Sequence, residues 1–228
     1  MLLKDAILAL TNQKVDDDND WYCWNDINPA KLPKGVTLPA GNAFARNVVL
    51  KRELHRLWNA SQEDDQLELA KYYVAVWGGV KRNSADTLRK YVTASQDDVI
   101  ANGVKGVASW SKVLCIRDPE AYAIFDARVS TSLNCLQIIH GVPNPVLYPL
   151  LPGQNRTIQK GTEHITTLAG ANAWTPASEH QYYRKYLSLV SEVANSCEAP
   201  NAKIYTIEML LFALAESLLA KAFPRTPF

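Results

Sequence analysis

The sequence predicts an all-α protein, built as a compact multi-helix domain that spans residues 1–228 as one unit or with two lobes. Apolar residues recur at helical spacing along most of the chain, and no segment longer than a few residues alternates like a half-buried strand. Hydrophobic residues make up 47% of the 228 residues, which is enough to bury a sizeable core. We therefore expect helices packed around a common interior.

The first half of the chain contains four segments with helical periodicity. They are expected over residues 2–11, 42–58, 64–77 and 85–95. The acidic and aromatic run 16–26, with the prolines that follow it, predicts a loop between the first two helices. Ser84 is a favoured residue type for starting a helix, and Gly78 with Gly79 is typical of a helix end.

The second half predicts a short helix, a glycine turn, and a helix around 110–116 that Pro119 ends. Asp126 stands where the N-cap of a further helix belongs, and Gly141 ends that helix. Residues 141–178 are rich in proline and show little periodicity, so they predict a long connection. Two more helices are expected over about 178–196 and 203–222, and the second is apolar nearly all round, as a central core helix would be.

Charge and cysteine content limit the functional classes. Twenty-four basic and 23 acidic residues leave a net charge of +1, so binding to nucleic acid would require a local basic patch. The four cysteines are dispersed without metal-ligand spacing, and no metal site is expected. Apolar surroundings of Cys115 and Cys135 favour free thiols in a reducing cytoplasm. We expect a cytoplasmic protein, a monomer, with no membrane partner.

The most informative stretch runs from Asn102 to Asn134 and begins with the turn GVKGV. Gly103 and Gly106 permit a tight turn between two helices, while Val104 and Val107 can anchor it in the core. Such a turn points backbone amides outward, where they can hold a phosphate together with a helix N-terminus. Short glycine turns between helices are common, so the turn alone is weak evidence.

The residues after the turn extend the pattern: VKGVASWSKVL is followed by an Asp-Pro break and then by AIFDARVSTSLN. Between Val74 and Ile139 the chain resembles the helix-hairpin-helix DNA glycosylase superfamily, and especially its 8-oxoguanine DNA glycosylase-like branch. In that family a hairpin, a lysine and a proline-containing turn precede an aspartate in a context like V-D-x-x-V. Asp126 and Val129 fall on the Asp-x-x-Val position.

The resemblance implies a base-excision repair enzyme that flips an oxidised purine out of duplex DNA and needs no redox cofactor, although a monovalent cation could sit at the hairpin. Asp126 would stabilise positive charge on the sugar, and a lysine amine would form a Schiff base that permits strand cleavage. Lys112 is the first candidate for that lysine and Lys105 the second. They precede Asp126 by 14 and 21 residues, and typical members have a longer helix in this interval than the 14-residue spacing allows.

Contacts with the damaged duplex follow from the same resemblance. Phosphate contacts are expected from Gly103, Val104, Gly106, Lys81, Arg82 and Arg128. The base is expected to stack on an aromatic side chain, for which the candidates are Trp110, Trp77 and Phe125.

Each of these residues also has an ordinary structural interpretation. Asp126 can be a simple N-cap, Lys112 a solvated helix lysine, and the two tryptophans core residues. Two alternative functions therefore stay open. One is a non-catalytic helix-hairpin-helix DNA-binding protein, and the other is a helical interaction protein whose glycine turn only connects two helices.

Overall fold

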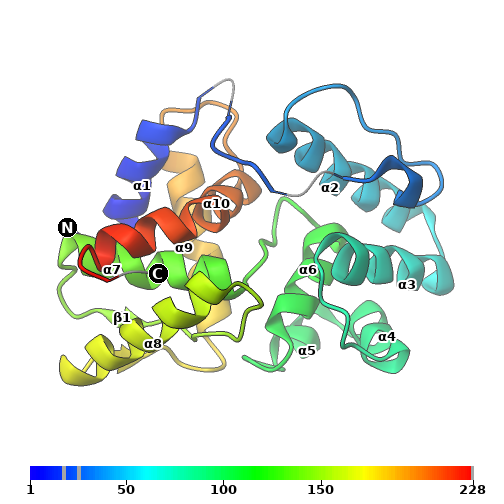
Figure 1. The fold of residues 1–228 in the computed structure, drawn as a ribbon. Coiled ribbons are helices and arrows are strands. Elements are labelled where there is room, and N and C mark those ends of the chain that lie inside the picture. Colours follow the sequence, from blue (N-terminus) through cyan, green and yellow to red (C-terminus); the bar gives the residue numbers. More distant parts are fainter. Residues whose placement is uncertain (17–18, 25–26, 227–228) are drawn as a thin grey trace. The chain divides into compact units, whose positions relative to one another are not determined.

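The computed structural model describes residues 1–16, 19–24 and 27–226, and it is predominantly helical (Figure 1). The chain divides into two compact units. Unit 1 combines the first 17 residues with residues 125–228, and unit 2 comprises residues 18–124. The predicted helix-hairpin-helix region, about 97–140, therefore contributes its hairpin to unit 2 and its aspartate to unit 1.

Unit 2 is helical throughout its described elements. They are η1 (Pro29–Lys31), α2 (Ala43–Ala60), α3 (Glu63–Lys71), η2 (Tyr72–Trp77), α4 (Ala85–Thr93), α5 (Gln96–Ile100) and α6 (Val107–Arg117). α6 contacts α2, α3, α4, α5 and η2, and residues 109–116 are all buried, so this helix forms the centre of the unit.

Local side-chain chemistry starts several helices of unit 2 where the sequence predicts. Ser84 accepts a hydrogen bond from the Thr87 amide, which confirms it as the N-cap of α4. Ser95 caps α5 by accepting a hydrogen bond from the Asp98 amide. The predicted helix 64–77 changes at Tyr72 into η2, a single π-helical segment that ends at Gly78.

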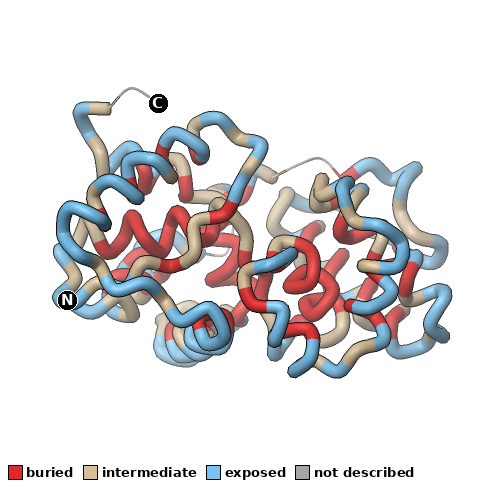
Figure 2. The backbone as a smooth tube through the Cα atoms, turned by 90° about the horizontal axis from the view of Figure 1, so that it is seen from below, coloured by how far each residue is buried: buried red, intermediate tan, exposed pale blue. Residues whose placement is uncertain are grey.

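Unit 1 is built around its last helix. Its elements are α1 (Leu3–Lys14), α7 (Ala127–His140), β1 (Val146–Leu147), α8 (Arg156–Ala171), β2 (Thr175–Pro176), α9 (Tyr182–Ser196) and α10 (Ile204–Ala222). α10 contacts α7, α8 and α9, and α1 contacts α7 and α9. Figure 2 shows buried residues through the interior of each unit, which agrees with the prediction of α10 as a central core helix.

The prediction of a long connection over residues 141–178 is wrong for the middle of this range, because α8 forms there. Asn155 caps this helix by accepting from the Ile158 amide. Gly161 lies inside it, and a Cβ there would overlap the Leu219 side chain, so the glycine allows α8 to pack closely on α10. The two-residue strands β1 and β2 precede and follow α8 in the sequence, and they pair with each other in parallel.

No helix among the described residues is both long enough and apolar enough to cross a membrane. Glu208 lies in the buried part of α10 with 3% of its surface exposed. It interacts with neighbouring groups there. The run 16–26, predicted as a loop, includes four residues outside the described part of the chain, namely 17, 18, 25 and 26.

Candidate functional site

The turn between α5 and α6 has the backbone geometry that the sequence predicts. Gly103 and Gly106 have φ angles of 61° and 72°, both in the left-handed region that favours glycine. Val107 is 1% exposed and anchors the start of α6, whereas Val104 is only half-buried. The turn is therefore a tight hairpin held to the core mainly by its second valine.

The hairpin presents a run of backbone donors. Within the described part of the chain, the amides of Val104, Lys105 and Gly106 donate to no hydrogen bond. Lys105 and Gly106 are exposed, and α6 begins immediately after them with the positive end of its dipole. Successive backbone amides in turns can together bind an anion.

Two contacts fix the shape of the hairpin. The Trp110 indole Nε1 donates to the Lys105 carbonyl at 3.1 Å. A Cβ at Gly106 would come within 2.5 Å of the Tyr91 Oη, so the α4 tyrosine leaves room only for glycine. The amides are thus held in place by an indole and a phenol that belong to the core of unit 2.

Exposed cations lie on segments joined to this hairpin. Lys105 is in the turn itself, and Lys81 and Arg82 are exposed in the loop before α4. That loop is attached to α6 because Asn83 Nδ2 donates to Ser109 Oγ at 2.9 Å. The sequence alone points to neither Asn83 nor Tyr91, since a contact partner distant along the chain leaves no local pattern.

Lys112 points into the core of unit 2. Its side chain is 4% exposed, and its Nζ donates to the Ala108 carbonyl at 2.7 Å. Gly78 makes space for it, because a Cβ there would come within 2.6 Å of the Lys112 Cε. The interpretation of Lys112 as a solvated helix lysine is therefore wrong. Lys105 is the exposed lysine of the two candidates.

The predicted base platforms of unit 2 are packed against other residues. Trp110 has no exposed surface. Trp77 stacks on Tyr73 with 4.3 Å between ring centroids and donates its indole proton to Asn47 Oδ1. A base can stack only on a ring with an accessible face. Trp110 has no such face in this structure, and Trp77 is only 9% exposed, so neither ring is open to a base.

Asp126 begins α7 in unit 1 and is partly exposed. Its Oδ1 accepts hydrogen bonds from the Arg128 amide at 2.9 Å and the Val129 amide at 3.1 Å. This geometry confirms the predicted N-cap. Oδ2 has no hydrogen bond or ion pair with described residues, so one carboxylate oxygen remains available for another partner.

The neighbours of Asp126 are held by unit 1. Phe125 has no exposed surface and packs edge-on against Tyr182 and Tyr186, so it too offers no face to a base. Arg128 forms an ion pair with Glu216 and lies 5.3 Å over the Phe212 ring. A DNA phosphate would therefore have to compete with the Glu216 carboxylate for Arg128.

The predicted residues thus fall into two groups, one in each unit. Unit 2 brings together the hairpin amides, Lys105 and the 81–82 loop, and it buries Lys112 and Trp110. Unit 1 holds Asp126 and Arg128 at the start of α7. In the described part of the chain, no histidines, cysteines and acidic residues cluster as a metal site. Comparisons with protein-family models, curated proteins and solved structures found no match to this chain.

Proposed function

We propose that this protein is a helix-hairpin-helix DNA-binding protein that acts as a base-excision glycosylase on an oxidised purine in duplex DNA, with associated lyase activity. The observation that carries the proposal is the run of three backbone amides, Val104 to Gly106, that have no hydrogen-bond partner among described residues at an exposed turn. A DNA phosphate supplies the acceptor oxygens that these donors lack.

Charge around the hairpin supports an anionic ligand. Lys105, Lys81 and Arg82 are all exposed on segments tied to the start of α6. The net charge of the whole chain is only +1, so a local group of cations is what phosphate binding requires. Contacts with a few phosphates would bind DNA independently of its base sequence.

Asp126 would supply the electrostatic part of the chemistry. Its Oδ1 is fixed by two amides, and its Oδ2 is available to stabilise positive charge on the sugar as the base leaves. A lysine amine would then attack the sugar carbon as the glycosidic bond breaks, and the resulting Schiff base would permit strand cleavage. Lys112 and Lys105 are the two candidates for that amine.

Phosphate binding is tested by titrating the full chain with a fluorescent duplex at several salt concentrations. Changing Lys105, Lys81 or Arg82 to glutamine should weaken binding and lower the salt slope by about one for each phosphate that the variant no longer neutralises. Lys31→Gln is the matched control, because Lys31 is an exposed lysine of unit 2 in η1. An affinity that does not depend on salt, or a Lys31→Gln effect equal to the others, would contradict the proposal.

Catalysis is tested with duplexes that contain 8-oxoguanine or an abasic site. Asp126→Asn should slow base release by roughly 100-fold or more but keep the fold, since asparagine is also a favoured N-cap. Borohydride should trap a covalent adduct of the wild type on the abasic duplex. Loss of the adduct in Lys112→Gln or in Lys105→Gln identifies the amine.

Non-catalytic DNA binding is the second candidate function, and the position of Lys112 favours it. This side chain is 4% exposed and hydrogen-bonded to Ala108, as a structural lysine would be. Salt-dependent duplex binding with neither base release nor a trapped adduct would establish this alternative. Adduct formation that Lys112→Gln or Lys105→Gln abolishes would exclude it.

A further inference from the structure

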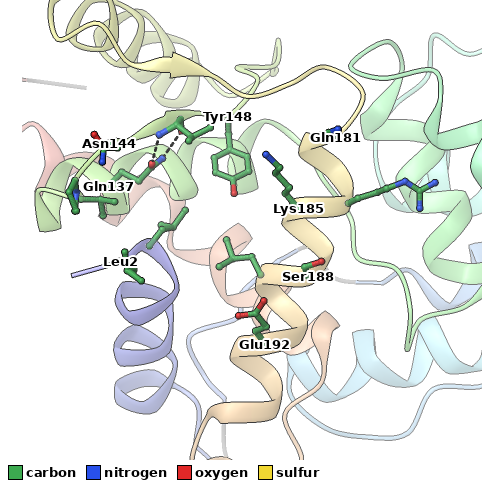
Figure 3. Close-up of a pocket in the computed structure, with 14 residues that line it drawn as sticks. Leu2, Gln137, Asn144, Tyr148, Gln181, Lys185, Ser188 and Glu192 are labelled. Atoms are coloured by element: carbon green, nitrogen blue, oxygen red, sulfur yellow. Dashed lines mark hydrogen bonds between the residues drawn. The ribbon is translucent and has the colours of Figure 1, made fainter.

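A pocket of about 690 Å³ lies wholly within unit 1, between the start of α1, the segment 142–148 and α9 (Figure 3). This volume is in the range of pockets that hold small organic ligands, roughly 300–1,000 Å³. None of the residues expected to contact DNA lines it. The DNA contacts proposed above therefore do not involve this pocket.

Apolar side chains form much of the pocket wall. They are Leu2, Leu3, Val142, Pro143, Val146 and Leu189. Leu2 is 61% exposed and Val146 is 37% exposed, and both are among the few large apolar residues in the described chain that remain open to solvent. Burying them under an apolar ligand would release water from that surface.

Tyr148 places a polar group inside this apolar surface. The residue is 7% exposed, and its hydroxyl has no hydrogen-bond partner among the described residues (Figure 3). Burial raises the pKa of this hydroxyl to about 12, so it stays protonated and can donate a hydrogen bond at neutral pH. Gln137 is not available for a ligand in the same way, because its side chain is bonded to the Val146 backbone.

The charge of the lining favours an anion. Lys185 extends from α9 toward Tyr148 and has no carboxylate partner in the described part of the chain (Figure 3). Glu192 is the one acidic residue of the lining, and Lys4 pairs with it at 3.3 Å. Lys185 thus supplies positive charge next to the Tyr148 hydroxyl, while Glu192 is neutralised by Lys4.

We propose that this pocket binds a small aromatic carboxylic acid. Its flat apolar body would cover Leu2 and Val146, and its carboxylate would accept hydrogen bonds from the Tyr148 hydroxyl and the Lys185 ammonium group. Recognition would require both parts, since an apolar surface alone gives little orientation and an exposed lysine alone gives little affinity.

The test uses isothermal titration calorimetry of the full chain with 2-naphthoate and with 2-naphthamide, which has the same shape without the charge. We expect 2-naphthoate to bind with a Kd of about 10–100 µM, and 2-naphthamide to bind at least about tenfold more weakly. No heat of binding with 2-naphthoate, or equal affinity for the two compounds, would overturn the proposal.

Variants locate the binding. Tyr148→Phe removes only a hydroxyl without a partner and should weaken 2-naphthoate binding about fivefold, and Lys185→Gln should weaken it about tenfold. Lys160→Gln is the matched control, because Lys160 is an exposed lysine of α8 that does not line the pocket. Unfolding curves establish that each variant is folded. Unchanged affinity in Lys185→Gln and Tyr148→Phe would place 2-naphthoate elsewhere and refute the assignment.

Discussion

The side-chain amide of Asn83 donates to the hydroxyl of Ser109 at 2.9 Å and thereby fastens the loop before α4 to the first turn of α6. This bond is half-buried, and the loop carries Lys81 and Arg82. The loop that carries these two cations is therefore fixed to the first turn of α6, the helix that follows the hairpin amides.

Removing that bond should reduce DNA binding without altering any charge. We expect Asn83→Ala to weaken duplex binding about two- to fivefold, because Lys81 and Arg82 lose their fixed position, and to lower the free energy of unfolding by about 1 kcal/mol. Fluorescence anisotropy and urea unfolding measure the two effects. Ser109→Ala should act similarly, and the double variant should add little; full additivity would show that the two side chains act separately.

Gly106 should tolerate alanine less well than Gly79 does. Both have left-handed φ angles, 72° and 69°, but only a Cβ at Gly106 meets another atom, the Tyr91 Oη at 2.5 Å. Gly79→Ala should cost about 1 kcal/mol of unfolding free energy, and Gly106→Ala about 2–4 kcal/mol.

Chemical unfolding of both variants checks this difference. Adding Tyr91→Phe to Gly106→Ala should recover about 1 kcal/mol or more, because the next tyrosine atom lies 3.6 Å from the added carbon. If the double variant is no more stable than Gly106→Ala, the loss of unfolding free energy comes from the strained backbone conformation and not from contact with Tyr91.

The buried thiol of Cys135 should make the protein sensitive to alkali. Burial raises the pKa of this thiol from 9.0 to about 12. The folded state then keeps its proton above pH 9 while the unfolded state loses it, so the free energy of unfolding falls as pH rises from 9 to 12. One such group contributes about 1.4 kcal/mol per pH unit across this window.

Unfolding titrations at pH 8–11 should therefore show a weaker pH dependence for Cys135→Ala than for the wild type. Cys23→Ala provides the control, because Cys23 is an exposed thiol. An equal pH dependence in Cys135→Ala and the wild type would mean that the thiol can ionise without unfolding.

Glu216 should stabilise the start of α7 more than a surface ion pair of the same unit does. It accepts from both Arg128 and Asn155, and 17% of the Arg128 side chain is exposed. We expect Glu216→Ala to cost about 1–2 kcal/mol of unfolding free energy, and Glu192→Ala, which breaks the exposed pair with Lys4, less than about 0.5 kcal/mol. Thermal unfolding of the two variants compares them directly.

Helix ends can be predicted from the sequence where one residue type decides them. Ser84 and Asp126 start helices through their own side-chain oxygens, and Gly141 ends α7 with a φ of 53°. α8 escapes prediction because Gly161 and several β-branched residues lower its helical propensity. Its stability comes from packing on Leu219, which is far away in the sequence.

Only the backbone turn of the candidate site can be predicted from the sequence. Gly103 and Gly106 indicate a turn by themselves, because left-handed φ angles favour glycine. The burial of Lys112 depends on Gly78, and the position of the 81–82 loop depends on Asn83 and Ser109. Such pairings between distant residues require the folded chain, and hydrophobic periodicity does not encode them.

The division of the chain has a consequence for the order of folding during synthesis. Every residue of unit 2 precedes α7, so this unit can fold while the ribosome is still translating the rest. α1 emerges before all of it but packs on α7 and α9, which are made later. α1 is therefore synthesised before the helices it packs on, and Ile7 and Leu10 can be buried only after α7 and α9 have been made.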